Sequence, residues 1–392
     1  MLFERILAFY GHQNIISTMT IQRKIKRRII IAISILVGLI LLLAVTAFFI
    51  FRMPAFGGSF EGRRLERMKS SPEYQDGRFE NSPKQNTDNS LIKNFKLYRQ
   101  GFVREPEFEI PVNKIHPNSL QKAAAPGFRV NWFGHATVLS EMDGVRFMTD
   151  PVLSERASPF KSVGPKRFHP TPIPLNDMSG IDFVVVSHDH YDHLDMETVK
   201  YLAKQATHFF VGLGVGAHLE KWGIPAEQIH EMDWWDEFTF RGLKIICTPA
   251  RHYSGRKAMD NSTLWASWIV KSPNHSVYFS GDTGYAGHFA DIRKKYGPID
   301  ISFMKVGAYG ETWLDIHMDP ESAVLAHKDL EAKIMLPVHW ATFDLSYHAW
   351  EEPILRTLSA AKSKNAEVIT PEVGEWFEFG KPFINHNWYQ KK

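Results

Sequence analysis

A long apolar run near the N-terminus constrains this chain more than any other feature. Residues 29–51 read IIIAISILVGLILLLAVTAFFIF, 23 residues without a charged side chain. As a helix, this run would be about 35 Å long, enough to cross the ~30 Å hydrocarbon core of a bilayer. The basic cluster 23-RKIKRR-28 precedes it. By the positive-inside rule, we predict a single-pass membrane protein. Its residues 1–28 would stay in the cytoplasm, and the chain after the run would lie on the outer, extracytoplasmic side.

Two other interpretations of the apolar run are weaker. A cleaved signal peptide is disfavoured because the run is long and no clean small-x-small cleavage site follows it. A buried helix of a soluble protein is disfavoured further by the length of the run and its basic flank. Met19 is an alternative start, which would leave a short basic leader, MTIQRKIKRR, before the run.

The remaining composition is that of a globular protein. The chain has 392 residues, of which 44% are hydrophobic and 23% charged, so it can bury a sizeable core. Its net charge of +3 is too weak to predict a nucleic-acid partner. The one cysteine, Cys247, excludes an intrachain disulfide and a cysteine-based zinc finger, and its apolar surroundings favour a core position.

The texture of the sequence changes near residue 126. Residues 52–125 are polar and rich in turn residues, which predicts a tether lying on the surface of a following domain, with a short helix around 64–68. Short apolar runs that alternate with turns predict strands near 128–134, 136–144, 145–151, 181–187, 209–214, 243–249, 264–270, 276–282, 300–306 and 334–340. Helices are predicted at 195–205 and 319–330, capped by Asp195 and Asp319. Strands mixed with helices predict a layered α/β domain over residues 126–385.

The stretch 187-SHDHYDHLD-195 follows the apolar run 181-IDFVVV-186 directly. Residues two apart at the end of a strand point the same way, so His188 and His190 can reach one cation together. The chain then turns towards the predicted helix, and that turn can bring Asp192 and His193 to a second cation. Imidazole and carboxylate are ligands that suit Zn²⁺ and related ions.

Three more candidate ligands each stand just after an apolar run. His252 lies in 249-PARHYSGR-256, Asp282 in 280-SGDTGY-285 and His339 in 337-PVHW-340. A core strand fixes the position of the residue that follows it, which is where functional residues gather. A carboxylate such as Asp282 can also bridge two ions. The pattern therefore predicts a dinuclear metal site.

These motifs together resemble the metallo-β-lactamase superfamily. Within it, the chain resembles the N-acyl-phosphatidylethanolamine-hydrolysing phospholipase D group and related lactonase-like hydrolases, over about residues 126–380. The stretches that carry the resemblance are 131-NWFGHATVL-139, 148-MTDPVLSERASPF-160, 164-GPKRFHP-170, 187-SHDHYDHLD-195, 281-GDTGY-285, 317-HMDPESAV-324 and 337-PVHWATF-343. The resemblance implies an αββα sandwich with the metals at the sheet edges, here preceded by one transmembrane helix.

The resemblance also implies two zinc ions per chain. The first would be held by His188, His190 and His252. The second would be held by Asp192, His193 and His339, and Asp282 would bridge the two. His317 would contact the phosphate or the leaving group, and His135 would support the ligands from behind. Tyr191, a spacer in the motif, would line the substrate entrance, whereas Asp189 would turn away from the metals.

The implied function is a zinc-dependent hydrolase of the phosphodiesterase class. Two zinc ions would supply a bridging hydroxide and offset the charge of a phosphodiester such as N-acyl-phosphatidylethanolamine, in a phospholipase D reaction. Asp192 and Asp282 would take part in catalysis, and His317 could protonate the departing alkoxide. A lactonase or esterase acting on a small soluble, sugar-phosphate-like substrate is an alternative, because the metals do not choose the substrate. A non-catalytic metal-binding envelope protein is disfavoured by the complete ligand set.

Several other residues are not expected to take part. His327 lies in a helical pattern, and no motif supports a functional role for His208, His218, His230 or His275. Trp234 and Trp235 are favoured as core residues over a lipid-facing role. The glycine-rich 211-VGLGVG-216 lacks the spacing of a nucleotide-binding loop.

Overall fold

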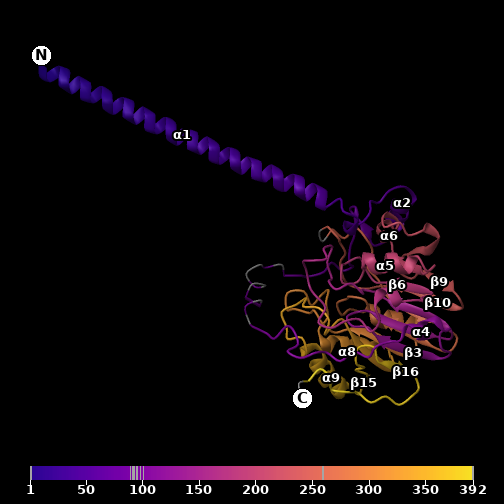
Figure 1. The fold of residues 1–392 in the computed structure, drawn as a ribbon. Coiled ribbons are helices and arrows are strands. Elements are labelled where there is room, and N and C mark those ends of the chain that lie inside the picture. Colours follow the sequence, from indigo (N-terminus) through magenta and orange to yellow (C-terminus); the bar gives the residue numbers. More distant parts are fainter. Residues whose placement is uncertain are drawn as a thin grey trace. The chain divides into compact units, whose positions relative to one another are not determined.

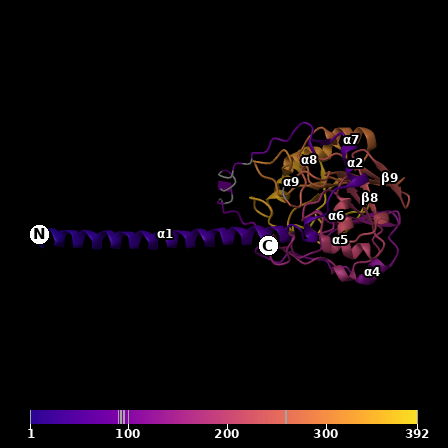
Figure 2. The same ribbon diagram turned by 90° about the horizontal axis from the view of Figure 1, so that it is seen from above.

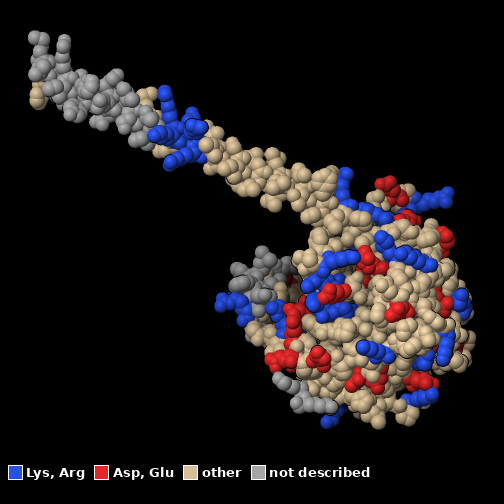
Figure 3. Space-filling model, in the orientation of Figure 1, with Lys and Arg blue, Asp and Glu red and all other residues tan. Residues whose placement is uncertain are grey.

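The computed structural model describes residues 2–88, 90, 93, 96, 97, 99, 101–257 and 260–390. The chain forms two compact units, Met1–Met53 and Pro54–Lys392. The first unit is the single helix α1, Leu2–Ile50, which includes nearly all of the apolar run (Figure 1). Its segment Gln22–Ile50 is long and apolar enough to cross a membrane, and it is not buried against other parts of the protein. Figure 3 shows the basic cluster of residues 23–28 as a blue group just before the apolar part.

The second unit contains two seven-stranded sheets. The first sheet runs in the order β16 (Trp376–Glu378), β3 (Phe128–Trp132), β4 (Val138–Met142), β5 (Val145–Thr149), β6 (Phe183–Val186), β7 (His208–Gly212) and β8 (Ile229–Met232). The second runs in the order β15 (Glu367–Val368), β14 (Ile334–Val338), β13 (Ile301–Lys305), β12 (Ser276–Phe279), β11 (Ser267–Lys271), β10 (Leu243–Thr248) and β9 (Glu237–Phe240). Half of each sheet is parallel: β5 to β8 in the first sheet and β12 to β15 in the second. The other strands of each sheet pair antiparallel.

Helices cover the outer faces of both sheets (Figures 1 and 2). The first sheet packs against α5 (Met196–Ala203) and α6 (Gly216–Lys221), with the short α4 (Pro117–Gln121) beside them. The second packs against α7 (His288–Tyr296), α8 (Pro320–Asp329) and α9 (Glu352–Lys364). The parallel strands are apolar on both faces because each is covered twice: Val185 faces the core between the sheets, and Val184 and Val186 face the helices. The predicted αββα sandwich is confirmed.

The predicted cap residues do cap their helices. The Asp195 side chain accepts a hydrogen bond from the Glu197 amide at the start of α5, and Asp319 accepts one from the Ser322 amide at the start of α8. Cys247 is buried in β10, and His327 is buried in α8, where it contacts Ser302.

Residues 54–79, within the predicted tether, belong to the second unit and pack closely on the rest of it. They form the turn η1 (Pro54–Phe56), the helix α2 (Gly62–Ser70) and the hairpin strands β1 (Tyr74–Gln75) and β2 (Arg78–Phe79), so the short helix near 64–68 is present. Met68 and Phe79 are fully buried in a cluster with Trp265. The Pro54 carbonyl accepts a hydrogen bond from Trp222 Nε1 at 2.7 Å.

Candidate metal centre

Three histidines converge where β6 and β10 end. His188 and His190 follow β6, and their Nε2 and Nδ1 atoms lie 2.7 Å apart. His252 follows β10, and its Nε2 lies 3.4 Å from His190 Nδ1. The ligand atoms of the three side chains lie within 4.8 Å of one another, which suits a single cation. The structure therefore brings together the three residues expected to share the first metal.

A second group forms beside the first. His193 Nε2 lies 3.1 Å from His339 Nε2. Asp192 Oδ2 lies 3.3 Å from His193 Nε2 and 3.4 Å from His339 Nε2. His135 joins this group, because its Nε2 is 3.0 Å from Asp192 Oδ2. It also packs its ring on His339, with centroids 3.9 Å apart. His135 therefore contacts both the carboxylate and one imidazole of this group.

Asp282 lies between the two groups. Its Oδ2 is 3.3 Å from His193 Nε2 and 3.9 Å from His252 Nε2, and its Oδ1 is 3.1 Å from His339 Nε2. The preceding Gly281 has a φ of +53°, and a Cβ there would stand 2.4 Å from the Ser187 side chain. Only glycine allows the loop after β12 to come this close to the loop after β6. That approach places Asp282 among the histidines.

His317 approaches the same carboxylate from the loop before α8. Its Nε2 lies 3.7 Å from Asp282 Oδ2, and its ring is 4.8 Å from that of His252. Lys305, at the end of β13, is fully buried nearby and donates a hydrogen bond to the Met318 carbonyl at 3.1 Å. Burial lowers the pKa of Lys305 to about 7. No sequence motif identified this buried lysine.

Most of the candidate ligands hold the protonation state that a metal requires, and His193 is the exception. Burial opposes protonation of His193, but Asp282 and Asp192 outweigh it and hold its pKa well above the ordinary value, so this imidazole must lose a proton when a cation binds. Burial lowers the pKa of His252 to about 3, and burial together with His193 holds the pKa of His188 well below its ordinary value. These imidazoles are therefore neutral. Burial opposes ionisation of Asp282, but the surrounding imidazoles, His339 foremost, overcome it and keep its pKa well below the usual range. Neutral imidazoles and ionised carboxylates bind metal without first losing a proton.

The donor set and its surroundings fit a bound metal. Asp282 Oδ1 is buried and accepts no hydrogen bond from any described residue, so a cation would satisfy it. His193 Nδ1 lies 2.6 Å from the buried carboxylate of Asp150. A carboxylate behind a metal-binding imidazole commonly orients the ring in this way. His339 has a φ of +66° and His135 a φ of +51°, conformations that cost about 1–3 kcal/mol each and are retained mainly at functional sites.

Asp189 points away from the metal-binding atoms, as expected, and its carboxylate binds other parts of the domain. Its carboxylate lies 3.2 Å from His218 Nε2 and accepts a hydrogen bond from the Gly255 amide at 2.8 Å. His218 Nδ1 in turn accepts a hydrogen bond from the Gly58 amide. His218, to which no role was expected from sequence, thus ties the N-terminal segment to the histidine motif. Its partners lie 29 and 160 residues away, so no local pattern could reveal them.

A cleft of about 690 Å³ opens over the cluster. His190, Asp192, Asp282, His317 and His339 form part of its lining, and Tyr191 is also there, as expected. Tyr253, which the sequence did not single out, lies in the lining with its ring 4.5 Å from that of His190. Burial raises the pKa of Tyr253 to about 12, so its hydroxyl stays protonated and can donate a hydrogen bond into the cleft.

One wall of the cleft is formed by residues 78–88, which we call the strap. Arg78, Glu80, Lys84, Gln85 and Thr87 line the cleft. Asn81 donates a hydrogen bond to the carbonyl of His252 at 2.7 Å. Arg251 donates to the Pro83 carbonyl at 2.5 Å and pairs with Asp315 at 2.6 Å. The strap is therefore fastened to the loops that carry His252 and His317.

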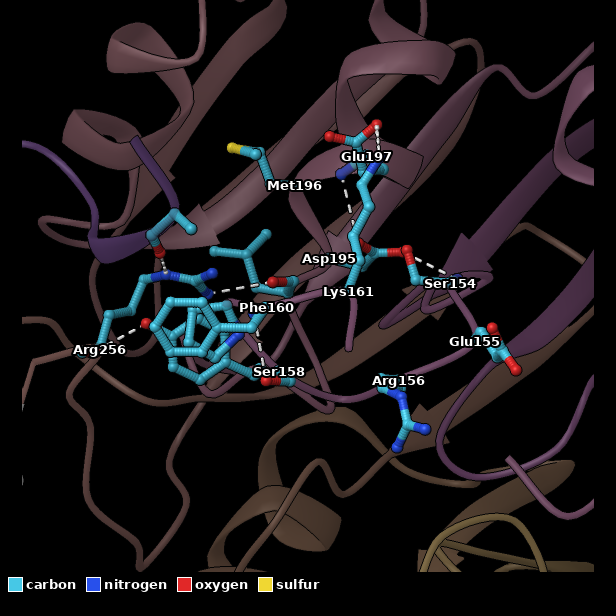
Figure 4. A pocket seen from close by; sticks show the side chains of 14 residues that line it. Ser154, Glu155, Arg156, Ser158, Phe160, Lys161, Asp195, Met196, Glu197 and Arg256 are labelled. Atoms are coloured by element: carbon cyan, nitrogen blue, oxygen red, sulfur yellow. Dashed lines mark hydrogen bonds and ion pairs between the residues drawn. The ribbon is translucent and has the colours of Figure 1, made fainter. Parts of the chain in front are cut away.

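A second pocket of about 330 Å³ shares Tyr191 with the cleft. Figure 4 shows Phe160, Lys161, Asp195 and Arg256 around it. Arg256 is buried and donates hydrogen bonds to the carbonyls of Ala55, Asp189 and Leu194. Its guanidinium lies 4.1 Å from the centre of the Tyr191 ring, so the ring is held in place between the two openings.

Comparisons with known proteins agree with this geometry. Residues 145–340 match the family model described as "Beta-lactamase superfamily domain". An uncharacterised protein of Mycobacterium tuberculosis is 42% identical over 331 residues, covering 82% of this chain and 88% of the relative. N-acyl-phosphatidylethanolamine-hydrolyzing phospholipase D 1 of Caenorhabditis elegans is 36% identical over 287 residues, covering 69% and 80%. The crystal structure of an isothiocyanate hydrolase from Delia radicum gut bacteria shares the fold, with a TM-score of 0.53 and 20% identity over 64% of this chain and 98% of that one.

The αββα fold, the histidine and aspartate cluster at the sheet edges and these similarities lead to one conclusion. The chain belongs to the metallo-β-lactamase superfamily, as a metal-dependent hydrolase that resembles the N-acyl-phosphatidylethanolamine-hydrolysing phospholipases D.

Proposed function

We propose that this protein is a membrane-anchored dinuclear zinc hydrolase that cleaves the phosphodiester of an N-acyl-phosphatidylethanolamine-type phospholipid, in a phospholipase D reaction. The observation that carries the proposal is the meeting of two ligand groups at Asp282, within 4.8 Å in each group, under an open cleft. The similarity to the Caenorhabditis elegans phospholipase D supports the choice of substrate.

The residues divide into two proposed metal sites. His188, His190 and His252 would hold one zinc ion; Asp192, His193 and His339 would hold the other; Asp282 would join both. Zinc pairs in such sites activate water and neutralise charge on a phosphodiester. The protein's part is to keep His188 and His252 neutral, to orient His193 through Asp150 and to orient Asp192 through His135.

His317 is placed to contact the substrate rather than to act as a strong acid. Burial, followed by the nearby Lys305, holds the pKa of His317 well below its ordinary value. The imidazole is therefore neutral and can donate one N–H hydrogen bond from the cleft wall. We assign it to an oxygen of the substrate phosphate or of the leaving group.

The short connection to the apolar helix supports a lipid substrate. From Phe51 to Ala55 the chain advances four residues and can span at most about 14 Å. Ala55 lines the pocket that shares Tyr191 with the metal cleft. A bilayer-spanning apolar run would tether the hydrolase domain to the membrane by this short connection, which raises the effective concentration of lipid around the domain. We propose that residues 1–28 lie in the cytoplasm and the hydrolase domain on the outer side.

The full-length protein, purified in detergent, should contain about two zinc ions per chain. It should cleave N-acyl-phosphatidylethanolamine and a simple aryl phosphodiester, and should leave a sugar lactone unchanged. Metal content is measured by mass spectrometry, and the three substrates are offered side by side. A metal content below one per chain would refute the dinuclear site, and hydrolysis of the lactone alone would select the lactonase alternative.

The apolar run should act as an uncleaved anchor. We expect the full-length protein to stay with the membrane fraction after washing with 1 M salt and with alkaline carbonate, because burial of a long apolar helix in lipid is not reversed by either. A variant lacking residues 2–53 should appear in the soluble fraction. A shortened protein that is released from cells with no deletion would instead identify the run as a cleaved signal peptide.

A further inference from the structure

The described lining of the metal cleft contains two lysine or arginine side chains, and both belong to the strap. They are Arg78 and Lys84. Their side chains are 54% and 75% exposed, so their charged ends lie at the open rim rather than at the metal-binding floor. These cations are therefore placed where they can meet the head group of a substrate that enters the cleft along the strap.

Glu80 stands between these cations and is fully engaged by them. Arg78 Nη2 lies 2.8 Å from Glu80 Oε1, and Lys84 Nζ lies 3.0 Å from Glu80 Oε2. Lys84, and after it Arg78, hold the pKa of Glu80 below its usual value. Both carboxylate oxygens therefore have a partner, and the three side chains together carry one net positive charge.

Among the described residues that line the cleft, none offers a free carboxylate to an incoming ammonium group. The other acidic side chains in the described lining are Asp192 and Asp282, and both face the imidazole cluster. A head group with a positively charged nitrogen would thus meet a rim of the same sign with no counter-charge. A head group whose nitrogen is uncharged would meet no such repulsion, and the negative phosphodiester would be attracted.

The strap is held to the rest of the domain at several points, and the carboxylate that pairs with both cations is itself buried. Glu80 and Asn81 are almost fully buried, and the backbone beyond them is held by Arg251 and, at the Asn86 amide, by Asp315. Anchored side chains lose less conformational freedom on binding than side chains on a free loop, so more of their electrostatic energy reaches the complex.

From this arrangement we infer that the strap selects substrates by the charge of their head group. Arg78 and Lys84 attract a negative head group, and Glu80 weakens that attraction because it pairs with both cations. The favoured class is a phosphodiester with net negative charge whose head-group nitrogen is acylated and uncharged. Zwitterionic phospholipids, whose head-group nitrogen carries a positive charge, are rejected at the rim. The inference rests on the proposed phosphodiesterase function, and it assigns specificity to a segment distant in sequence from the histidine motifs.

The test compares two water-soluble lipids on the full-length protein in a neutral detergent. One is dihexanoyl phosphatidylethanolamine acylated on nitrogen, which is anionic, and the other is dihexanoyl phosphatidylcholine, which is zwitterionic. The measured quantity is the ratio of kcat/KM for the first over the second. Exposed charges of this kind each contribute roughly a twofold to fivefold effect. Replacing both cations (Arg78→Gln with Lys84→Gln) should therefore lower the ratio about tenfold, through KM for the anionic lipid.

Replacing Glu80 should change the kcat/KM ratio in the opposite direction. Glu80→Gln releases both cations and should raise the ratio by about twofold to fivefold, and it should make the KM of the anionic lipid more dependent on salt. Lys244→Gln is the matched control, because Lys244 forms an exposed pair with Glu237 on β9 and β10, outside the described cleft lining. It should leave the ratio unchanged.

The outcomes separate the two levels of inference. If the wild-type protein cleaves neither lipid nor an aryl phosphodiester, the proposed function fails, and the strap has no such substrate to select. If it cleaves the anionic lipid but the ratio is the same in wild type, the double variant and Glu80→Gln, the function stands and the charge selection by the strap is refuted. Thermal melting of each variant near that of wild type shows that the strap is still in place.

Discussion

Asparagine in place of Asp282 is expected to reduce phosphodiesterase turnover about a hundredfold to a thousandfold, the loss typical when one electrostatic group that stabilises the transition state is removed. Asp282 is the carboxylate whose two oxygens approach both ligand groups: its Oδ2 lies 3.9 Å from His252 Nε2 in the first group, and its Oδ1 lies 3.1 Å from His339 Nε2 in the second. An amide has nearly the same shape but no charge, so it cannot offset two neighbouring cations. The proposed zinc content should therefore fall from two per chain to one or none.

The control for this variant is a second aspartate changed in the same way. Asp291→Asn lies in the first turn of α7, and Asp291 is not among the residues that could hold a metal. It should keep the wild-type zinc content and turnover. Asp282→Asn with full zinc content and turnover within about tenfold of wild type would show that Asp282 does not join the two metals. Equal melting temperatures would exclude unfolding as the cause of any loss.

The residues at the floor of the metal centre were predictable because each belongs to a short motif or directly follows an apolar run. His188, His190, Asp192 and His193 lie within one short stretch, and the strand before them fixes their direction. His252, Asp282 and His339 could be added because each follows an apolar run, and a core strand fixes the position of the residue after it. The αββα layers followed from the alternation of apolar runs with helical patterns.

The walls of the site were not predictable, because they depend on contacts between distant residues. The segment around Arg78 reads as a polar tether, and only the hydrogen bonds of Arg251 and Asn81 show that it forms one side of the cleft. The link between His218 and Asp189 likewise joins residues with no shared motif. Hydrophobic patterning shows which face of a helix or strand is buried, but it carries no information on which loops contact one another.

Edge elements were also missed, for a related reason. The sequence around β8 (Ile229–Met232) and β9 (Glu237–Phe240) was not predicted as strand, and β9 has exposed positions at three of its four residues. A strand at the border of a sheet has a neighbour on one side and less core to face, so its apolar signal is weak. The helices α6, α7 and α9 show a similar mixture of buried and polar residues, and only the tertiary structure shows that they pack on the sheets.

Replacing Glu141 by glutamine is expected to cost about 3–5 kcal/mol of unfolding free energy, because it leaves a buried guanidinium without its counter-charge. Glu141, in β4, is fully buried. Its Oε1 lies 2.6 Å from Arg146 Nη2, and its Oε2 lies 2.6 Å from Arg129 Nη2. Arg146 is 2% exposed and also donates to the Leu120 and Gly180 carbonyls, so it cannot turn towards water. Urea unfolding of the wild-type and variant proteins measures the difference.

The same carboxylate should make the stability of the protein depend on acid pH. Burial opposes ionisation of Glu141, but the Ala125 amide and the two guanidinium groups outweigh it and lower its pKa. A folded-state pKa below the unfolded value of about 4.3 means that this stabilisation is complete above that pH. It is lost as pH falls through the lower, folded-state pKa. Glu141→Gln should therefore be less stable than wild type at pH 7, and the gap should narrow in acid. Glu378→Gln, which removes an exposed pair with Lys381, should cost less than about 1 kcal/mol at either pH. A Glu141→Gln protein as stable as wild type at pH 7 would show that the buried pair gives no net stabilisation over an amide.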